Sequence, residues 1–357
     1  MGRKSCKILT ALIICFLAAC VKDKPEIANN IPANASGNIY IVCEGNYGIG
    51  NASLYLYQPT RDSVYGDIYK AANNQPLGDV FQSMTRIGDQ FFLCVNNSNK
   101  VVVINATNWK VTATISVPQP RDILSVSNNK AYVSSLYHNS VYIINTQTFQ
   151  QTGTINFPNQ NTEGMCLYYN NAFICTWDTA GNNIYKVNTT TDQIIQTIKV
   201  AGSAPQEVLL DKEQMLWVLS GNQPQGKTAT LTRLDPSTGQ ILASYQFSVD
   251  VDPLHPAFNK TKDTLYFIEA NYYGGTSNNG VYRMDIHAAA LPSRAFVQAL
   301  QYQYFWALGI DPLTDDIYIG DPKGFTQRGS VYVYGPDGTQ IKSFNVGLGP
   351  GHFYFDE

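Results

Sequence analysis

The stretch that decides the fold is Lys130 to Ile155, KAYVSSLYHNSVYIINTQTFQQTGTI. Three short runs rich in Tyr, Val and Ile follow one another in this region, at 130–135, 140–145 and 151–157. Runs of this kind between polar loops indicate β-strands. The preceding run, 121–127, is predicted to be an inner strand that joins the run at 130–135 through a two-residue hairpin turn, Asn128-Asn129. Asn suits this turn because it tolerates the positive φ that the turn requires. The stretch therefore predicts one four-stranded antiparallel unit.

This unit recurs along the chain at a spacing typical of propeller blades. An aromatic residue opens a short apolar strand seven times, with gaps of 52, 40, 41, 44, 49 and 52 residues. These residues are Tyr40, Phe92, Tyr132, Phe173, Trp217, Tyr266 and Tyr318. Repeats of this length are characteristic of β-propellers. The sequence therefore predicts an all-β fold, a seven-bladed β-propeller.

The two ends of the chain are predicted to share the first blade. The chain enters the fold at Asn38 on what matches a second strand, 39–43, so blade one lacks an inner strand. The segment 349–355 follows the outer strand of blade seven and has the pattern of an inner strand. We expect this C-terminal strand to supply the inner strand of blade one, which closes the ring and removes an exposed sheet edge.

The first 37 residues are set apart from the ring. A basic start and an apolar run over 8–17 lead to Leu17-Ala18-Ala19-Cys20. This pattern resembles a bacterial lipoprotein signal, which implies cleavage after residue 19 and acylation of Cys20. An ordinary secretory signal with a chance cysteine is the alternative. We expect residues 1–19 to be a signal peptide, 20–37 a lipidated, flexible tether, and 38–357 a single domain.

Composition and cysteine spacing exclude several classes of function. The net charge is −3 and no basic stripe is present, which argues against nucleic acid. Among the cysteines of the domain, Cys166 and Cys175 would face each other across a turn at Asn170-Asn171, and a disulfide between them is one alternative. Two reduced, buried thiols are favoured, because directly paired strand cysteines suit disulfide geometry only at non-hydrogen-bonded positions. No spacing resembles a zinc or redox motif.

One face of the ring is the predicted ligand-binding face. In a propeller, the first residues of the inner strands and the loops joining second to third strands lie on the same face. Aromatic rings there offer contact area, and amides and charges fix a ligand's orientation. The predicted ligand-binding residues are Gln82, Arg121, Asp122, Tyr137, His138, Glu163, Trp177, Asp178, Gln206, Asn222, His255, Tyr272, Tyr273, Trp306, Phe325, Arg328 and His352.

Blade three also carries a family resemblance. Tyr132-Val133-Ser134-Ser135, followed by NSVYIINT at 139–146, is similar to the repeat of the YVTN-type, or YncE-like, seven-bladed propellers, and weaker copies cover nearly all of 38–357. In Bacteroidota, lipid-anchored propellers of this kind include surface proteins that capture cobalamin and related corrinoids above a TonB-dependent outer-membrane transporter. The resemblance implies a lipoprotein anchored in the outer membrane, with the cell surface favoured over the periplasmic face.

Two classes of function therefore follow. The first is a binding protein that takes a small or medium-sized ligand, a corrinoid such as cobalamin being the leading candidate, and delivers it to a transporter. The alternative is a metal-assisted hydrolase or lyase of lactonase type, suggested by the charged ring of Arg121, Asp122, Glu163 and Glu207 and by His138, His255 and His352. For Arg121, Asp122 and Glu163, an ion pair at the channel mouth is favoured over a general-base site. The three histidines are not expected to bind metal. A protein-binding platform is a third candidate. We predict no catalytic residue and no cofactor.

Overall fold

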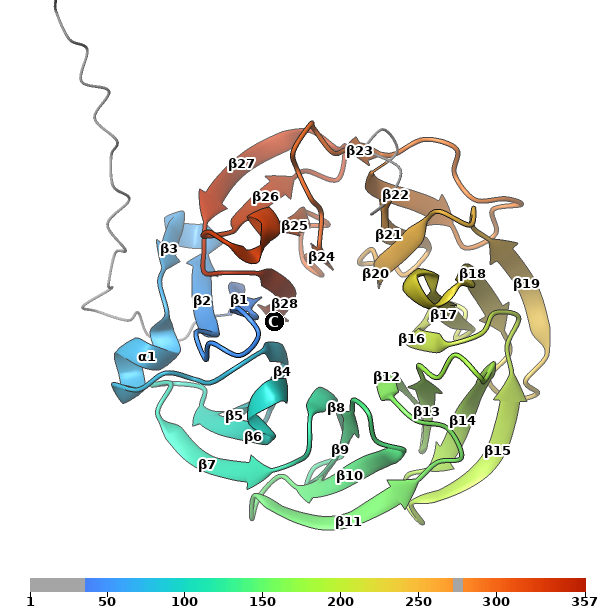
Figure 1. Ribbon diagram of the computed structural model, residues 1–357, viewed down its shortest axis with the longest axis horizontal. Helices are drawn as coiled ribbons and strands as arrows, with labels where there is room; N and C mark the ends of the chain where they lie inside the picture. Colours follow the sequence, from blue (N-terminus) through green and yellow to red (C-terminus); the bar gives the residue numbers. More distant parts are fainter. Residues whose placement is uncertain (1–35, 272–278) are drawn as a thin grey trace, which may run out of the picture.

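The computed structural model describes residues 36–271 and 279–357, which form seven four-stranded antiparallel sheets. The sheets stand as blades in a ring, with the inner strands around the centre and the outer strands on the circumference (Figure 1). The predicted seven-bladed β-propeller is therefore confirmed. Among the described residues, no helix has the length and apolar character needed to cross a membrane.

The blades follow one another in chain order. Blade one comprises β28 (Pro350–Asp356), β1 (Asn38–Cys43), β2 (Ser53–Gln58) and β3 (Ser63–Tyr65). Blade two comprises β4 (Phe81–Ile87), β5 (Gln90–Val95), β6 (Lys100–Asn105) and β7 (Val111–Ser116). Blade three comprises β8 (Pro120–Ser127), β9 (Lys130–Ser135), β10 (Ser140–Asn145) and β11 (Gln150–Asn156). Blade four comprises β12 (Thr162–Tyr168), β13 (Asn171–Thr176), β14 (Asn183–Asn188) and β15 (Gln193–Lys199).

The remaining blades complete the circle. Blade five comprises β16 (Pro205–Leu210), β17 (Leu216–Asn222), β18 (Lys227–Leu234) and β19 (Ile241–Gln246). Blade six comprises β20 (Asp252–Phe258), β21 (Thr264–Ala270), β22 (Gly280–Asp285) and β23 (Val297–Gln298). Blade seven comprises β24 (Ala307–Ile310), β25 (Ile317–Asp321), β26 (Ser330–Tyr334) and β27 (Gln340–Asn345). Short helices are α1 (Ile68–Asn73), η1 (Pro59–Arg61), η2 (Asn96–Ser98), η3 (Gln223–Gln225) and η4 (Lys323–Phe325).

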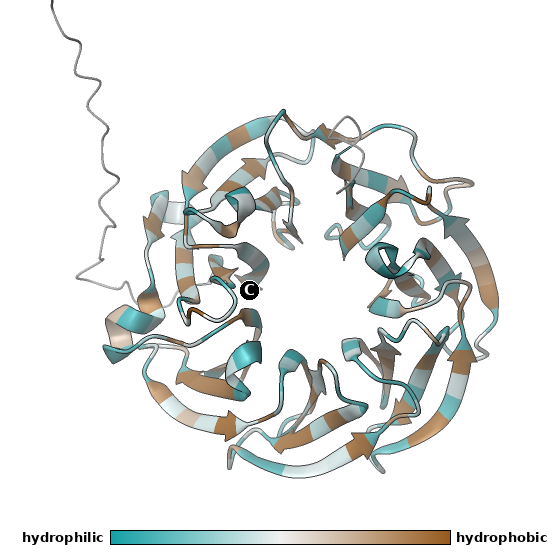
Figure 2. Cartoon of the chain, in the orientation of Figure 1, coloured by the Kyte–Doolittle hydropathy of each residue, from teal (hydrophilic) through white to brown (hydrophobic). Residues whose placement is uncertain are grey.

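The hydrophobic cores lie between neighbouring blades. The seven aromatic residues that mark the repeat all lie in second strands and are all buried. Second strands such as β1 and β5 are apolar along almost their whole length, since both of their faces pack against another blade. The outer strands β15 and β27 instead alternate between exposed and half-buried residues, and Figure 2 shows the corresponding alternation of hydropathy along the circumference.

The ring closes where β28 pairs with β1. Asn38 lies opposite Asp356 and Val42 opposite His352, so the C-terminal strand supplies the inner strand of blade one as predicted. Asp356 also forms an ion pair with Arg86 of blade two, with 2.7 Å between Arg86 Nη1 and Asp356 Oδ1. Because Glu44 directly follows the other end of β1, the chain enters the ring on the face opposite to that of Glu44.

The hairpin turn of blade four differs from the prediction. Ser127 pairs with Lys130, which confirms the Asn128-Asn129 turn in blade three, but Tyr168 pairs with Asn171 in blade four. The blade-four turn is therefore Tyr169-Asn170, with Tyr169 at a φ of 52°. Burial sets the register here, because it sends Ala172 and Ile174 to one core and Phe173 and Cys175 to the other.

This register also decides the cysteine question. Cys166 lies opposite Phe173, and Cys175 lies opposite Ile184 of β14, so the predicted facing of the two cysteines is wrong. All four described cysteines, Cys43, Cys94, Cys166 and Cys175, are free thiols. The favoured alternative, two reduced and buried thiols, is confirmed as to the absence of a disulfide and the burial of Cys175, whereas Cys166 is only half-buried.

Candidate functional site

A cavity of about 450 Å³ opens on the predicted ligand-binding face. It is lined by Glu44, Gln82, Arg121, Glu163, Trp177, Gln206, Glu207, Pro224, Asp252, Leu254, His255 and Trp306. Most of these residues begin an inner strand, from β4 round to β24, while Glu44, Trp177 and Pro224 come from loops that join second to third strands. The volume lies within the range of small-molecule sites.

Seven predicted site residues meet in this cavity: Gln82, Arg121, Glu163, Trp177, Gln206, His255 and Trp306. Sequence reasoning missed four lining residues, namely Glu44, Pro224, Asp252 and Leu254. Glu44 carried a usable signal, since it directly follows the second strand of blade one, whereas Asp252 lies in a strand whose start was not visible in the sequence. The inner strand of blade six begins at Asp252, three residues before the predicted site residue His255, and contains a bulge between Leu254 and Ala257.

His255 owes its position to this bulge. Its φ is 48°, in the left-handed region that non-glycine residues seldom adopt. A bulge inserts an extra residue and redirects the local side chain, which here lines the cavity. The His255 ring lies 6.3 Å from that of Trp306, nearly perpendicular to it.

The other predicted residues lie behind or around the cavity. Phe325 packs edge-on against Trp306 at 5.7 Å, and the Asn222 side chain accepts a bond from Gln225 that caps the helix carrying Pro224. Asp178 accepts bonds from Asn159, Gln160 and Ala180, and Arg328 donates to the Val346 carbonyl. Asp122 and His352 are half-buried and are not part of the cavity lining. Tyr137 and His138 lie on a loop, where the Tyr137 side chain is exposed. Tyr272 and Tyr273 lie outside the described residues.

Arg121 organises one side of the cavity. Its Nη2 lies 2.6 Å from Glu163 Oε1, its Nε donates to the same oxygen, and its Nη1 donates to Gln82 Oε1 at 2.6 Å. The three side chains come from three consecutive inner strands, β4, β8 and β12. The predicted ion pair at the channel mouth is therefore present between Arg121 and Glu163.

The two tryptophans are fixed by their indole nitrogens. Trp306 Nε1 donates to Glu44 Oε1, and Trp177 Nε1 donates to the Gly221 carbonyl of blade five, both at 2.8 Å. Burial raises the pKa of Glu44 even though Trp306 donates to it. Each indole is thus held in a set orientation and leaves ring surface along the cavity wall.

The remaining titratable groups are shifted toward their neutral forms. Burial, with the nearby carboxyls of Glu163 and Asp122, raises the pKa of Glu207 to about 8. Burial also raises the pKa of Asp252 to about 6 and that of Asp122 to about 6. Burial lowers the pKa of His255 to about 4, with His352 and Arg121 contributing. Perturbed titratable groups in a concave site are typical of functional sites.

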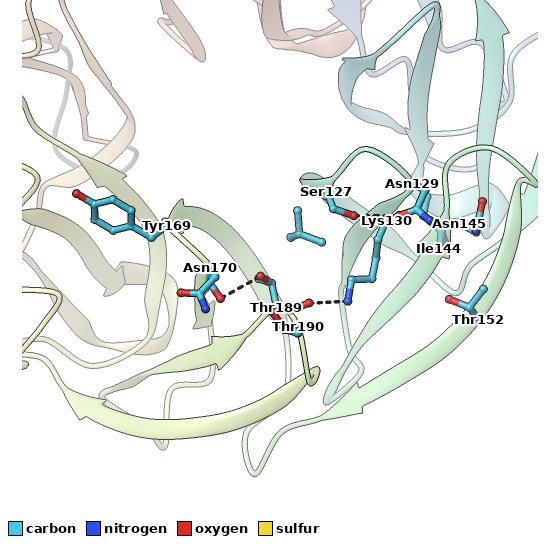
Figure 3. Close-up of a pocket in the computed structure, with 11 residues that line it drawn as sticks. Ser127, Asn129, Lys130, Ile144, Asn145, Thr152, Tyr169, Asn170, Thr189 and Thr190 are labelled. Carbon is cyan, nitrogen blue, oxygen red and sulfur yellow. Dashed lines mark hydrogen bonds between the residues drawn. The ribbon is translucent and has the colours of Figure 1, made fainter.

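A second hollow, of about 760 Å³, lies between blades three and four on the opposite face (Figure 3). Its one cationic lining side chain, Lys130, is already engaged by the Thr189 carbonyl and by Asp192. The Tyr169 ring points away from Lys130 in Figure 3 and is 78% exposed. This second hollow, although larger than the central cavity, is therefore lined by turn backbone and small polar groups and has no set of converging functional groups.

No group of three or more His, Cys, Asp or Glu side chains within residues 36–271 and 279–357 is arranged to hold a metal ion. His255 and His352 are close enough for one to affect the other's pKa. His138 lies apart from them, on the loop between β9 and β10.

Fold and cavity together define a seven-bladed β-propeller with an aromatic and acidic cavity at the centre of one face. The chain belongs to the family described as a domain of unknown function, DUF5074, which matches residues 37–356. No curated protein matches it in sequence.

Solved structures of similar fold include proteins with different named activities. A quinonprotein alcohol dehydrogenase-like protein from Bacteroides thetaiotaomicron is 11% identical, with a TM-score of 0.66 over 90% of this chain and 78% of that one. A putative 6-phosphogluconolactonase from Bacteroides fragilis is also 11% identical, with a TM-score of 0.66 over 92% of this chain and 100% of that one. A streptogramin B lyase is 14% identical, with a TM-score of 0.55 over 74% and 82%. At sequence identities this low, the similarity to these structures shows a common fold alone.

Proposed function

We propose that this protein is a ligand-binding lipoprotein of the cell envelope, which captures a small or medium-sized ligand in the central cavity. The observation that carries this proposal is the cavity itself, where two oriented indoles, two amides and four carboxyls from different blades line a volume of about 450 Å³. A corrinoid such as cobalamin is the leading ligand. Because a corrin with its side chains is larger than the cavity, part of it would insert and the rest would lie on the surrounding loops.

The position of the cavity agrees with an anchor at Cys20. The described chain enters on the face opposite the cavity, since Asn38 and Glu44 lie at opposite ends of β1. A tether over residues 20–37 would therefore leave the cavity facing away from the membrane, toward a TonB-dependent transporter or toward the medium. Placement in the outer membrane, at the cell surface, is part of this proposal.

Calorimetric titration of the purified protein with cyanocobalamin and with cobinamide tests the proposal. We expect one-to-one binding, weakened about tenfold or more in Trp177→Ala and in Trp306→Ala because each change removes a large part of the contact surface. Tyr169→Ala, which removes an exposed ring on the opposite face, is the matched control. Absence of heat and of a thermal shift with both corrinoids would remove the corrinoid assignment.

An enzyme of lactonase or lyase type is the second candidate. Its supporting observation is Glu207, whose pKa of about 8 suits a general acid near neutral pH. Structural neighbours named as a lactonase and a lyase share the fold. Turnover of a lactone that depends on added divalent metal and is lost in Glu207→Gln would favour this candidate over simple capture.

A further inference from the structure

The two sides of the central cavity differ in how their polar groups are paired. On the side of blades seven, one, two and three, Trp306 donates to Glu44, and Arg121 donates both to Gln82 and to Glu163. Every long polar side chain on this side therefore has at least one partner within the protein. This side is complete without a ligand.

The side formed by blades five and six is incomplete. The side chains of Glu207, Asp252 and His255 all line the cavity and make no hydrogen bond with any residue in 36–271 or 279–357. Glu163 adds an independent sign, because Arg121 uses only its Oε1 and leaves the buried Oε2 without a partner. Buried polar groups in folded proteins are nearly always paired, so the buried Oε2 of Glu163 marks a point where a bound molecule would donate. Glu207, Asp252 and His255 are half-buried, and their side chains are open to a molecule in the cavity.

The charges in the cavity point in the same direction. Four carboxyl groups line it against one guanidinium, that of Arg121, which Glu163 already engages. The pKa of Glu207 rises to about 8 through burial and through the facing carboxyls of Glu163 and Asp122. Asp252 faces no titratable group that alters its pKa, and burial alone raises that pKa to about 6. The cavity thus has more carboxyl groups than cationic side chains, and its single guanidinium is already paired.

Close packing holds Glu207 in this position. A Cβ atom placed on Gly164 of the neighbouring inner strand would lie 2.6 Å from the Gln206 carbonyl oxygen and 2.9 Å from Glu207 Oε2. The carboxyl therefore rests against a glycine backbone, with its open side toward the cavity. Trp177, bonded to blade five through Gly221, and Pro224 supply apolar surface in the same cavity.

We propose that the cavity selects a ligand bearing an N–H donor group, an ammonium or a primary amide, which binds Glu207 and Asp252 while an apolar part of the ligand lies against Trp177. Aromatic faces also attract cations, so the same wall suits a charged donor. This inference deepens the proposed function and rests on the cavity being the ligand site. It identifies the chemical group that is recognised and does not depend on the ligand being a corrinoid.

Two pairs of probes matched in shape test the inference on the full protein: phenethylammonium with phenethyl alcohol, and phenylpropanamide with phenylpropionate. We expect at least one of the two N–H donors to bind about tenfold or more tightly than the alcohol, and the carboxylate not to bind. Glu207→Gln and Asp252→Asn should each weaken the donor probe about tenfold. Asp89→Asn, which makes the same chemical change at an exposed turn on the opposite face, should leave the affinity unchanged.

An ammonium probe should also displace a proton. Because a bound cation favours the ionised form of Glu207, affinity should rise with pH up to about 8, at most about tenfold per unit. Titration at pH 7 to 8 in buffers of different ionisation enthalpy measures this proton release, which should disappear in Glu207→Gln, because Asp252, with a pKa of about 6, is already mostly ionised there.

The inference is overturned if the alcohol or the carboxylate binds as tightly as both donors, or if no donor binds at millimolar concentration. Titration with cyanocobalamin reports separately on the proposed function. Binding of cyanocobalamin that is unaffected by Glu207→Gln and Asp252→Asn would retain the capture function and reject the donor-group inference. Donor binding without corrinoid binding would reject only the corrinoid assignment.

Discussion

Replacing Glu207 with glutamine should stabilise the ring by an amount that grows with pH. In the folded protein the pKa of this carboxyl is raised from its ordinary value of 4.5 to about 8. Between these two values the unfolded chain has released the proton while the folded ring still holds it. Folding therefore becomes less favourable by about 1.4 kcal/mol for each pH unit in this window. Glutamine has the same shape and no proton to lose.

The expected gain follows from these two pKa values. At pH 5 the unfolded carboxyl has only begun to ionise, so Glu207→Gln should gain less than about 1 kcal/mol in free energy of unfolding. At pH 7 the gain should reach about 3 kcal/mol, and it should level off above pH 8, where the folded protein ionises too.

Equilibrium urea unfolding at pH 5, 7 and 8.5 measures this difference. Asp89→Asn, which makes the same kind of change at an exposed turn on the opposite face, serves as the control. A gain that is equal at pH 5 and pH 7, or a loss of stability at pH 7, would refute the assignment of a strongly raised pKa to Glu207.

Three further predictions concern the ring. Deletion of 350–357 removes β28 and leaves β1 without its inner neighbour. We therefore expect the protein to unfold without cooperativity, in a broad, early transition measured by circular dichroism. A sharp transition near that of the full chain would contradict closure of the ring by β28. Gly164→Ala should lower the free energy of unfolding, measured in urea, by about 1–3 kcal/mol, because the new Cβ meets the Gln206 backbone. Gly181→Ala should lower it less, because the new Cβ meets the Asn159 side chain. Burial raises the pKa of the thiols of Cys43, Cys94, Cys166 and Cys175, that of Cys166 to about 12. A thiol reagent at pH 8 should therefore modify none of these four in the folded protein and all four in urea. Rapid labelling of any of the four in the folded protein would contradict the raised pKa values.

The blades were predictable because each one repeats the same local requirement. Tyr132 and its six counterparts must be apolar, since second strands are buried between two blades, and a turn residue such as Asn129 must follow each inner strand at a fixed distance. The closure followed from counting strands, as 39–43 had no inner partner and 349–355 had no blade. These properties belong to the repeat and are visible in sequence.

The parts that were missed depend on irregularities. The bulge that redirects His255 also moves the start of its strand to Asp252, and nothing in the local composition specifies an inserted residue. The turn at Tyr169-Asn170 was misplaced because the register obeys burial of Phe173 more than the turn preference of Asn171. Prediction from the repeat therefore identified the face that carries the central cavity but listed only part of the cavity lining.

The pairing of β1 with β28 also sets the order of events during folding. Asn38 lies at the start of the ring, and its partner Asp356 lies in the strand that completes it. Blades two to seven can each form from a continuous segment, whereas blade one must wait until β28 is present. The ring therefore closes only when β28 is available, and a product that lacks β28 keeps an open strand edge that quality-control proteases and chaperones can recognise.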